Sequence, residues 1–196
     1  VESGPGIEVR MWLAAGRAAA LAARRRRLAG PTGCGLCGVD SLEAASPAPR
    51  RVGEGLRLSP DDIAAALDAL TEAQALGRAT RAVHAAGWWR QGERLVAARE
   101  DVGRHNALDK LAGAMAREGR DAGDGFVLVT SRCSFEMVEK AVRMGAGMIV
   151  AVSAPTDLAV RRAEESGLTL VALARADGHM VFSRPDRLVE AALEVA

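Results

Sequence analysis

The sequence predicts an α/β fold in which a largely parallel sheet is covered by helices on both faces. Short apolar runs alternate with helical patterns of about ten to fifteen residues, which is typical of parallel strands joined by crossover helices. A hairpin comes first and no Gly-x-Gly-x-x-Gly motif follows a strand, so the order departs from that of a Rossmann domain. Hydrophobic residues make up 49% of the 196 residues, which is enough for a buried core.

Residues 1–58 are expected to form an N-terminal segment distinct from an α/β domain over 59–196. The alternation from Ile7 to Leu13 predicts a strand, and residues 16–29, rich in Ala, Leu and Arg, predict a helix. Their glycine and proline content predicts a loop over 30–40 and a linker over 44–58. The chain opens without Met, so we expect it to be a piece of a longer protein.

The α/β domain is predicted to begin with a helix that is capped by Ser59 and ends before Gly77. Strands over 80–88 and 93–99 should then form a hairpin. Periodicity and turn residues predict the rest in this order: a helix over 104–118, a strand over 126–129, a helix over 134–144, a strand over 148–152, a helix over 156–165, a strand over 168–173, a turn at 177–178, a strand over 180–182 and a helix over 185–195.

The charge balance excludes two broad classes of partner. The chain has 26 Lys and Arg against 25 Asp and Glu, so its net charge of +1 offers no general attraction to nucleic acid or to an anionic membrane. No apolar run approaches the roughly 18 residues of a membrane-spanning helix, and no secretory signal is visible. Three cysteines that cannot all pair within one chain indicate reduced, cytoplasmic cysteine chemistry.

The cations are unevenly divided, with 24 Arg and only two Lys, and the chain has a single Asn. Strong bias towards Ala, Arg and Gly accounts for most surface cations being Arg. The exceptions are therefore of interest, and they are Lys110, Lys140 and Asn106. All three lie in or next to polar segments that follow predicted strands, where an ammonium or a carboxamide is expected to be needed specifically.

The first segment with chemical potential is the glycine-rich stretch that contains Cys34 and Cys37. Two thiolates at this spacing could form half of a zinc site, but no second pair of ligands at short spacing is present. A thioredoxin-like dithiol would sit at a helix start, which the flanking glycines do not indicate. An exposed loop with two thiols suits a carrier instead, and sulfur held as a persulfide is the natural cargo. Two incidental cysteines in a loop are the remaining alternative.

The second segment runs from Glu100 to Lys110, between a strand end and a helix start. Gly103 and Arg104 at a helix N-terminus form a typical anion site, because backbone N–H groups and a guanidinium point at the ligand. The alternative is a solvated helix start with Asp101 as its N-cap.

The third segment, Ser131–Glu136, also lies between a strand end and a helix start, and it leads towards Lys140. Ligands of open sheets bind outside the carboxyl ends of strands, where both polar segments should sit. Simple capping by Ser131 or Ser134 is the alternative, although it leaves Arg132 and Glu136 unexplained. We interpret Cys133 as a buried small residue, and His84 as either a core residue or a group facing the same cleft.

Four stretches, T-G-C-G-L-C-G, E-D-V-G-R-H-N-A-x-D-K, S-R-C-S-F-E-x-V-x-K-A and S-A-P-T-x-L-A-V, occur in this order. Together they resemble the formate dehydrogenase accessory sulfurtransferase family (FdhD/NarQ), over nearly the whole chain. The resemblance implies a cytoplasmic, homodimeric sulfurtransferase that takes persulfide sulfur from a cysteine desulfurase. The sulfur would pass to the molybdenum or tungsten bis(pyranopterin guanine dinucleotide) cofactor before that cofactor enters formate dehydrogenase. By this match Cys34 carries the persulfide and Cys37 assists.

The same match, together with the anion chemistry of the two helix starts, assigns cofactor binding to Gly103, Arg104, His105, Asn106, Lys110, Ser131, Arg132, Ser134, His179, Met180, Val181, Phe182, Ser183 and Arg184. The chain departs from the family pattern at residues 80–82, at Ser131, and at Met180 and Phe182, where the family more often has Asn and Tyr. In the last stretch we therefore expect the backbone contacts of the family, and not its side-chain contacts at Met180 and Phe182. No structural metal is expected.

The family resemblance also implies a three-layer, cytidine-deaminase-like mixed sheet, with a partial N-terminal α+β segment that carries the CxxC loop. Zinc deaminases place H-x-E and P-C-x-x-C at two helix starts, where this chain has His105-Asn106-Ala107 and Arg132–Glu136. The metal ligands and the acid–base Glu are missing, so deamination is not expected. Two alternatives to sulfur transfer stay open: a cofactor-binding chaperone without sulfur chemistry, and a zinc protein of deaminase ancestry.

Overall fold

The computed structural model describes residues 2–3, 6–7, 12–23, 50–54 and 56–189. The chain divides into two units, Val1–Pro47 and Ala48–Ala196. Residues 50–58, which the sequence grouped with the N-terminal segment, belong to the second unit, and Leu56 and Leu58 are buried in its core. The CxxC loop with Cys34 and Cys37, the run Arg24–Arg27 and most of the predicted linker lie outside the described residues.

In the first unit, strands β1 (Glu2–Ser3) and β2 (Gly6–Ile7) pair antiparallel, and helix α1 spans Ala15–Ala23. The helix prediction for 16–29 is confirmed as far as residue 23, and the rest of that range lies outside the described residues. The predicted strand from Ile7 to Leu13 is wrong at its end, because Trp12 and Leu13 are not in a strand. Both side chains are exposed, and no strand pairs with Trp12 or Leu13 among the residues that the structure describes.

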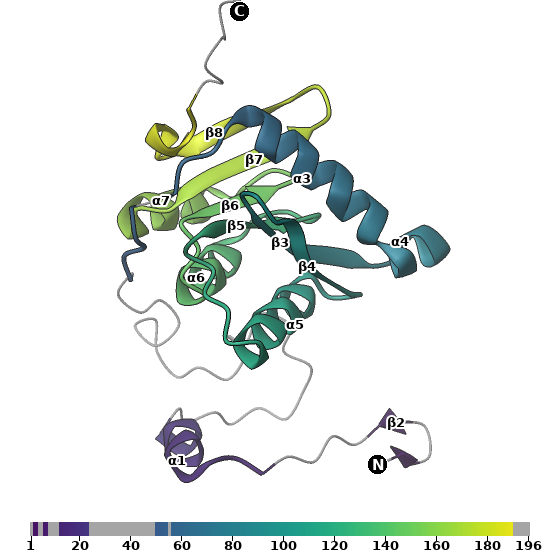
Figure 1. Cartoon of the computed structure of the whole chain (residues 1–196). Helices are drawn as coiled ribbons and strands as arrows, with labels where there is room; N and C mark the ends of the chain where they lie inside the picture. Colours follow the sequence, from purple (N-terminus) through teal and green to yellow (C-terminus); the bar gives the residue numbers. More distant parts are fainter. Residues whose placement is uncertain (1, 4–5, 8–11, 24–49, 55, 190–196) are drawn as a thin grey trace, which may run out of the picture. The chain divides into compact units, whose positions relative to one another are not determined.

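The second unit contains a six-stranded sheet in the order β4-β3-β5-β6-β7-β8 (Figure 1). The strands are β3 (His84–Arg90), β4 (Arg94–Asp101), β5 (Gly125–Val129), β6 (Met148–Ala151), β7 (Thr169–Arg175) and β8 (Gly178–Ser183). Only the pairs β5–β6 and β6–β7 are parallel. The expectation of a largely parallel sheet therefore holds for the centre alone, because a hairpin supplies antiparallel strands on each side.

Helices cover both faces of the sheet, so the unit has three layers (Figure 1). Helix α3 (Pro60–Ala73) packs on one face, and α5 (Arg104–Arg117), α6 (Phe135–Arg143) and α7 (Asp157–Ser166) pack on the other. The likeness of this layering to cytidine deaminases stays a prediction.

The short helix α4 (Ala75–Thr80) follows α3 directly and corrects two predictions. Gly77 lies inside α4 instead of ending α3, and residue 80 is helical instead of beginning a strand. The Glu100 carboxylate explains the difference, since its two oxygens accept the backbone N–H groups of Leu76 and Gly77 at 2.9 and 2.7 Å. A distant acid thus satisfies the first turn of α4, which local sequence patterns do not reveal.

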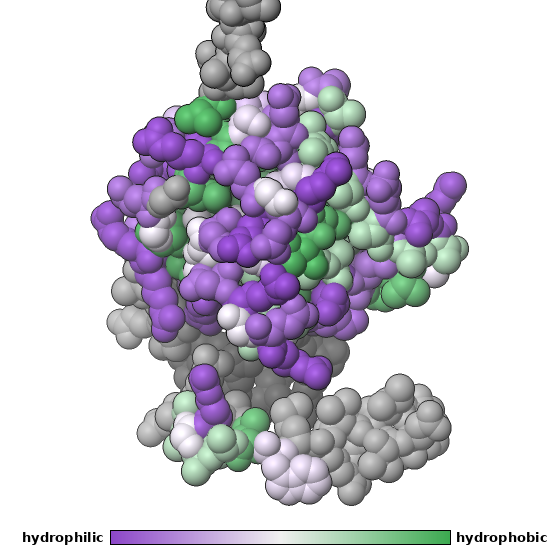
Figure 2. All heavy atoms as spheres, in the orientation of Figure 1, coloured by the Kyte–Doolittle hydropathy of each residue, from purple (hydrophilic) through white to green (hydrophobic). Residues whose placement is uncertain are grey.

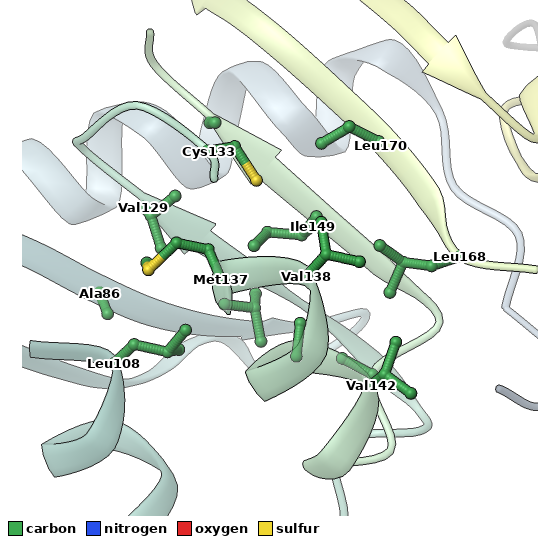
Figure 3. Packing of buried hydrophobic residues seen from close by; sticks show 14 of the residues in the cluster. Ala86, Leu108, Val129, Cys133, Met137, Val138, Val142, Ile149, Leu168 and Leu170 are labelled. Carbon is green, nitrogen blue, oxygen red and sulfur yellow. The ribbon is translucent and has the colours of Figure 1, made fainter. Parts of the chain in front are cut away.

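The core is divided by the sheet into two apolar layers. Between the sheet and α5–α7, Leu108, Met137 and Val138 pack towards Val129 and Ile149 (Figure 3). On the other face, the apolar side of α3 packs against the sheet through Ile63, Ala66 and Leu70, as the periodicity predicted. The surface seen in Figure 2 is mainly hydrophilic over the second unit. Among the described residues, no helix is long and apolar enough to cross a membrane.

The end of the described chain also differs from its prediction. Over residues 185–189, where the predicted last helix should begin, the structure has a 3₁₀ turn, Pro185–Arg187, after which Leu188 pairs with Leu58. The cause is Arg187, whose buried guanidinium donates to the carbonyls of Gly167 and Gly53 at 2.6 and 2.7 Å. These bonds hold the 3₁₀ turn against the segments around Gly167 and Gly53. Residues 190–195 lie outside the described residues.

Candidate functional site

Helices α5 and α6 begin at the same edge of the sheet. Strand β3 lies between β4 and β5, and its register sets His84 opposite Asp101 and Ala86 opposite Val129. The carboxyl ends of β4 and β5 therefore flank the start of β3, and α5 and α6 follow from those ends. The structure thus confirms that both polar segments lie at the carboxyl edge, the expected place for a ligand in such a sheet.

The starts of these two helices lack the side-chain caps that α3 and α7 have. Ser59 accepts the N–H of Asp62 in α3, and Thr156 accepts that of Ala159 in α7. In contrast, Gly103 before α5 and Ser134 before α6 make no capping bond. The Met137 N–H donates to the Ser134 carbonyl at 3.0 Å, and the earlier N–H groups of both first turns can bind an anion, which the helix dipole also favours.

The capping alternatives for the two segments are wrong. Asp101 is not the N-cap of α5, since its Oδ1 accepts the N–H of Gly103, which is itself the cap residue. Ser131 is buried and its hydroxyl donates to the carbonyl of Arg132, while Ser134 caps nothing. Arg132 is exposed.

Five buried polar atoms without a hydrogen-bond partner come from these two helix starts, among the residues that the structure describes. They are Nε of Arg104, both ring nitrogens of His105, Oγ of Ser134 and Oε2 of Glu136. A buried polar atom without a partner costs about 1–3 kcal/mol, so a water or a ligand is expected to satisfy this set. The side chain of His105 is only 5% exposed.

Electrostatics at this cluster favour a neutral His105. Burial lowers the pKa of its imidazole most, and the cations Arg104 and Lys140 lower it further. The carboxylates of Glu136 and Asp109 act in the opposite direction without reversing the shift. A neutral imidazole offers one donor and one acceptor to a ligand.

The two lysines, Lys110 in α5 and Lys140 in α6, reach groups at or near the start of α5, and both are engaged. Lys110 Nζ is 2.5 Å from Oδ2 of Asp101 and donates to the Glu100 carbonyl at 3.0 Å. Lys140 Nζ is 2.6 Å from Oδ2 of Asp109 and donates to the His105 carbonyl at 3.3 Å. Both ammonium groups thus bind backbone carbonyls, those of Glu100 and His105, next to the polar cluster.

Asp101 connects the first turn of α5 to the end of β4. Besides Lys110 and the N–H of Gly103, its carboxylate accepts the carboxamide of Asn106 at 3.2 Å. The Lys110 hydrogen bond, followed by that from Gly103, lowers the pKa of Asp101 below its ordinary value. Asp101, Asp109 and Glu136 were not among the assigned site residues. The four-residue spacing of His105 and Asp109 on one helix face was the available signal for Asp109.

The last stretch assigned to cofactor binding, residues 179–184, is not brought to these helix starts within the unit. Most of this stretch forms β8, and strands β6 and β7 lie between β8 and β5. Strand β8 is antiparallel to β7, so it runs away from the carboxyl edge. Met180 and Val181 are exposed and Phe182 is half-buried. Buried Ser183 donates to the Leu168 carbonyl at 2.8 Å, and Arg184 pairs with Asp186.

Only His179 in that segment lies near the carboxyl edge. It lines a pocket of about 230 Å³ with Pro60, Asp61 and the β7–β8 turn at Arg175 and Asp177. This pocket involves α3, on the sheet face opposite to α5 and α6.

Cys133 is buried, as the sequence predicted. Its side chain is 0% exposed, and burial raises the pKa of its thiol to about 12. Figure 3 shows its sulfur pointing into the apolar layer near Ile149. Such a thiol is chemically inert, so sulfur chemistry would have to use other cysteines. Among the described residues, no group of three His, Cys, Asp or Glu side chains is arranged to hold a metal ion.

Comparison with known proteins gives concordant matches. The model of the FdhD/NarQ family matches residues 5–189. A sulfur carrier protein FdhD from Agrobacterium fabrum is 50% identical over 190 residues, which cover 96% of this chain and 70% of that protein. The corresponding protein from Cupriavidus necator is 50% identical over 183 residues, covering 93% of this chain and 64% of that one.

A solved structure, described as a formate dehydrogenase accessory protein from Desulfotalea psychrophila, is similar with a TM-score of 0.65 and 35% identity. The similarity covers 72% of this chain and 59% of that one. The chain therefore spans about two thirds of the length of the curated relatives named above, and less of the solved structure.

Proposed function

Because the chain belongs to the FdhD/NarQ family, we propose that it is a sulfur carrier that acts in the maturation of formate dehydrogenase. The names of its relatives support the sulfur chemistry, and the solved homologue supports the link to formate dehydrogenase. Within this proposal, the protein works in the cytoplasm as a homodimer.

Cys34 and Cys37 are the proposed sulfur-handling residues. The Cys34 thiolate attacks the outer sulfur of a persulfide on a cysteine desulfurase, forms the Cys34 persulfide and releases the donor's thiolate. Cys37, three positions along the chain, assists the later release of that sulfur. The buried thiol of Cys133, with its raised pKa, is unsuited to either step.

The proposed acceptor of the sulfur is the metal of the bis(pyranopterin guanine dinucleotide) cofactor, which is a bound substrate here. Its two pyrophosphates carry the charge that uncapped helix starts attract. Arg104 and the exposed Arg132 supply guanidinium groups beside the starts of α5 and α6. The observation that carries this assignment is the buried His105, whose two ring nitrogens lack a partner between those starts.

Mass spectrometry tests the carrier role. After incubation with a cysteine desulfurase and cysteine, a species heavier by about 32 Da, one sulfur atom, is expected on Cys34 or Cys37. The Cys133→Ala variant should carry the same adduct, because that thiol is buried. A protein that gains no sulfur under conditions in which the desulfurase is active would refute the carrier role.

A cofactor-binding chaperone is the second candidate function. It is favoured by one feature: among the residues that the structure describes, the polar cluster at the starts of α5 and α6 contains no reactive cysteine. The double variant Cys34→Ala, Cys37→Ala separates the two functions. Activation of formate dehydrogenase should be lost if the protein carries sulfur, and should persist if it only delivers the cofactor.

A further inference from the structure

The two lysines of the chain differ in what they connect. Lys110 joins groups within the β4–α5 junction, where its partners are Asp101 and the Glu100 carbonyl. Lys140 projects from α6 to α5, where it meets the Asp109 carboxylate and the His105 carbonyl. Among the described residues, these are the side-chain hydrogen bonds that link α6 to α5. Lys140 therefore ties together two helices whose starts form the polar cluster.

The position of Lys140 suits a tie better than a ligand contact. Its side chain is only 20% exposed and its ammonium lies between two oxygen atoms on α5. One of them belongs to the peptide of His105, the residue whose imidazole is buried without a partner. A compact ammonium with three donors can satisfy both oxygens, which agrees with Lys at this position in a chain that has 24 Arg.

We propose that Lys140 is a positioning residue that holds α5 against α6, so that their two uncapped starts bind one phosphorylated ligand together. The inference rests on the proposed function, because that function supplies the ligand. Binding sites need their groups held within about 0.5 Å, and a displacement of about 1 Å can cost two orders of magnitude in rate. A bond between the helices is a direct means of fixing their spacing.

The charges around His105 allow positioning to be distinguished from simple attraction of a ligand by Lys140. Arg104 and Asp109 on α5, and Glu136 and Lys140 on α6, all act on the imidazole. Lys140→Met removes a cation and the tie, whereas Asp109→Asn removes an anion and weakens the same tie. If Lys140 acted by charge alone, Asp109→Asn would strengthen the binding of an anion. If it acts by position, both variants weaken that binding.

The test uses isothermal titration calorimetry of the full chain with GDP and, separately, inorganic pyrophosphate. We expect Lys140→Met to weaken GDP binding about ten-fold and Asp109→Asn about three-fold, a modest part of what misplacement can cost. Arg143→Met serves as the control, because it removes a half-exposed cation from the same helix α6 without touching α5. It should bind GDP like the parent protein.

A second readout follows His105 by NMR, assigned with a His105→Asn variant. Its pKa should rise in Lys140→Met, which loses a cation, and fall further in Asp109→Asn, which loses an anion. The proposal is supported if the affinity for GDP falls in both Lys140→Met and Asp109→Asn while the pKa of His105 moves in opposite directions in the two variants. Tighter GDP binding by Asp109→Asn, or unchanged binding by both variants, overturns the proposal.

If Lys140→Met does not fold, Asp109→Asn decides the matter alone, since Asp109 is 59% exposed and its loss should leave the fold intact. Failure of the proposed function gives a different result. In that case the parent protein itself binds neither GDP nor pyrophosphate, or gains no sulfur from a desulfurase.

Discussion

The carboxylate of Asp101 makes the start of α5 sensitive to one substitution, Asp101→Asn. The wild-type carboxylate accepts from the Gly103 N–H at 2.9 Å and lies 2.5 Å from the Lys110 ammonium. Asparagine keeps the size and one acceptor oxygen, so the Gly103 bond can survive. Its amide nitrogen, however, is a donor that faces the Lys110 ammonium, also a donor. The substitution thus removes the charged bond and leaves Lys110 with the Glu100 carbonyl.

The magnitude follows from the exposure of the two partners. A hydrogen bond between charged groups contributes about 1.5–3 kcal/mol where it is shielded, and exposed ion pairs contribute about 0–1 kcal/mol. Asp101 is 20% exposed and Lys110 52% exposed, which places this pair between those limits. We expect Asp101→Asn to lower the free energy of unfolding by about 1–2 kcal/mol at neutral pH.

The pH dependence provides the sharper check. The folded-state pKa of Asp101 is lowered from the ordinary value of 3.8, so its carboxylate stabilises the fold above that value. This contribution is lost as the pH falls through the lowered folded-state pKa. Urea unfolding should therefore show a constant gap between wild type and variant from neutral pH down to about pH 5, and a shrinking gap below 3.8.

Asp157→Asn is the control for this experiment. Asp157 pairs with Arg161 on the surface of α7, and both side chains are more than two-thirds exposed. Its loss should change the free energy of unfolding by less than about 1 kcal/mol. The reasoning fails if Asp101→Asn and Asp157→Asn are equally stable, or if the gap for Asp101→Asn does not close in acid.

Three further predictions concern the fold. Native protein should not be alkylated at Cys133 at pH 8, because its thiol is buried with a pKa near 12; peptide mapping should find the label there only after denaturation. Arg187→Met should cost about 2–6 kcal/mol in urea unfolding, since it leaves the Gly167 and Gly53 carbonyls without their donor at about 1–3 kcal/mol each; a loss under about 1 kcal/mol would contradict this. Gly125→Ala should cost about 1–3 kcal/mol, the size of core overpacking, or more, because a Cβ would lie 2.2 Å from the Trp89 carbonyl oxygen. Gly113→Ala is the matched control, because Gly113 lies on an open helix surface, and it should stabilise the fold by up to about 1 kcal/mol. Thermal unfolding distinguishes the two variants.

Local patterns predicted the elements that have strong periodicity and clear boundaries. Ser59 and Pro60 marked the start of α3, and the interval from Arg104 to Glu118 matched α5 within one residue. These cases succeed because capping and amphipathic spacing are decided within one turn or one helix. The order of alternating strands and helices also led to the three layers, although two hairpins make the sheet mixed.

The two clearest failures share a cause, which is an interaction between distant residues. Glu100 begins a second helix that contains Gly77, 23 positions away, where a local reading expects a helix end. Arg187 bonds to Gly53, 134 positions away, and a short turn lies at 185–187, where the predicted last helix should begin. The candidate site likewise has features that local sequence predicts and features that depend on distant residues. Its two helix starts were predicted from sequence, but the tie from Lys140 to Asp109, 31 positions away, needed the structure.

The helix starts of the second unit themselves argue for where function lies. Where packing alone is required, at α3 and α7, Ser59 and Thr156 cap the first turn in the ordinary way. At α5 and α6 the fold places Gly103 and an unbonded Ser134 instead, beside buried polar atoms that lack partners. Each such atom is costly, and real proteins break local rules of this kind chiefly at functional sites. Lys140 and Lys110 then stabilise the backbone of these starts without filling them, which leaves the N–H groups available for the phosphates of a ligand.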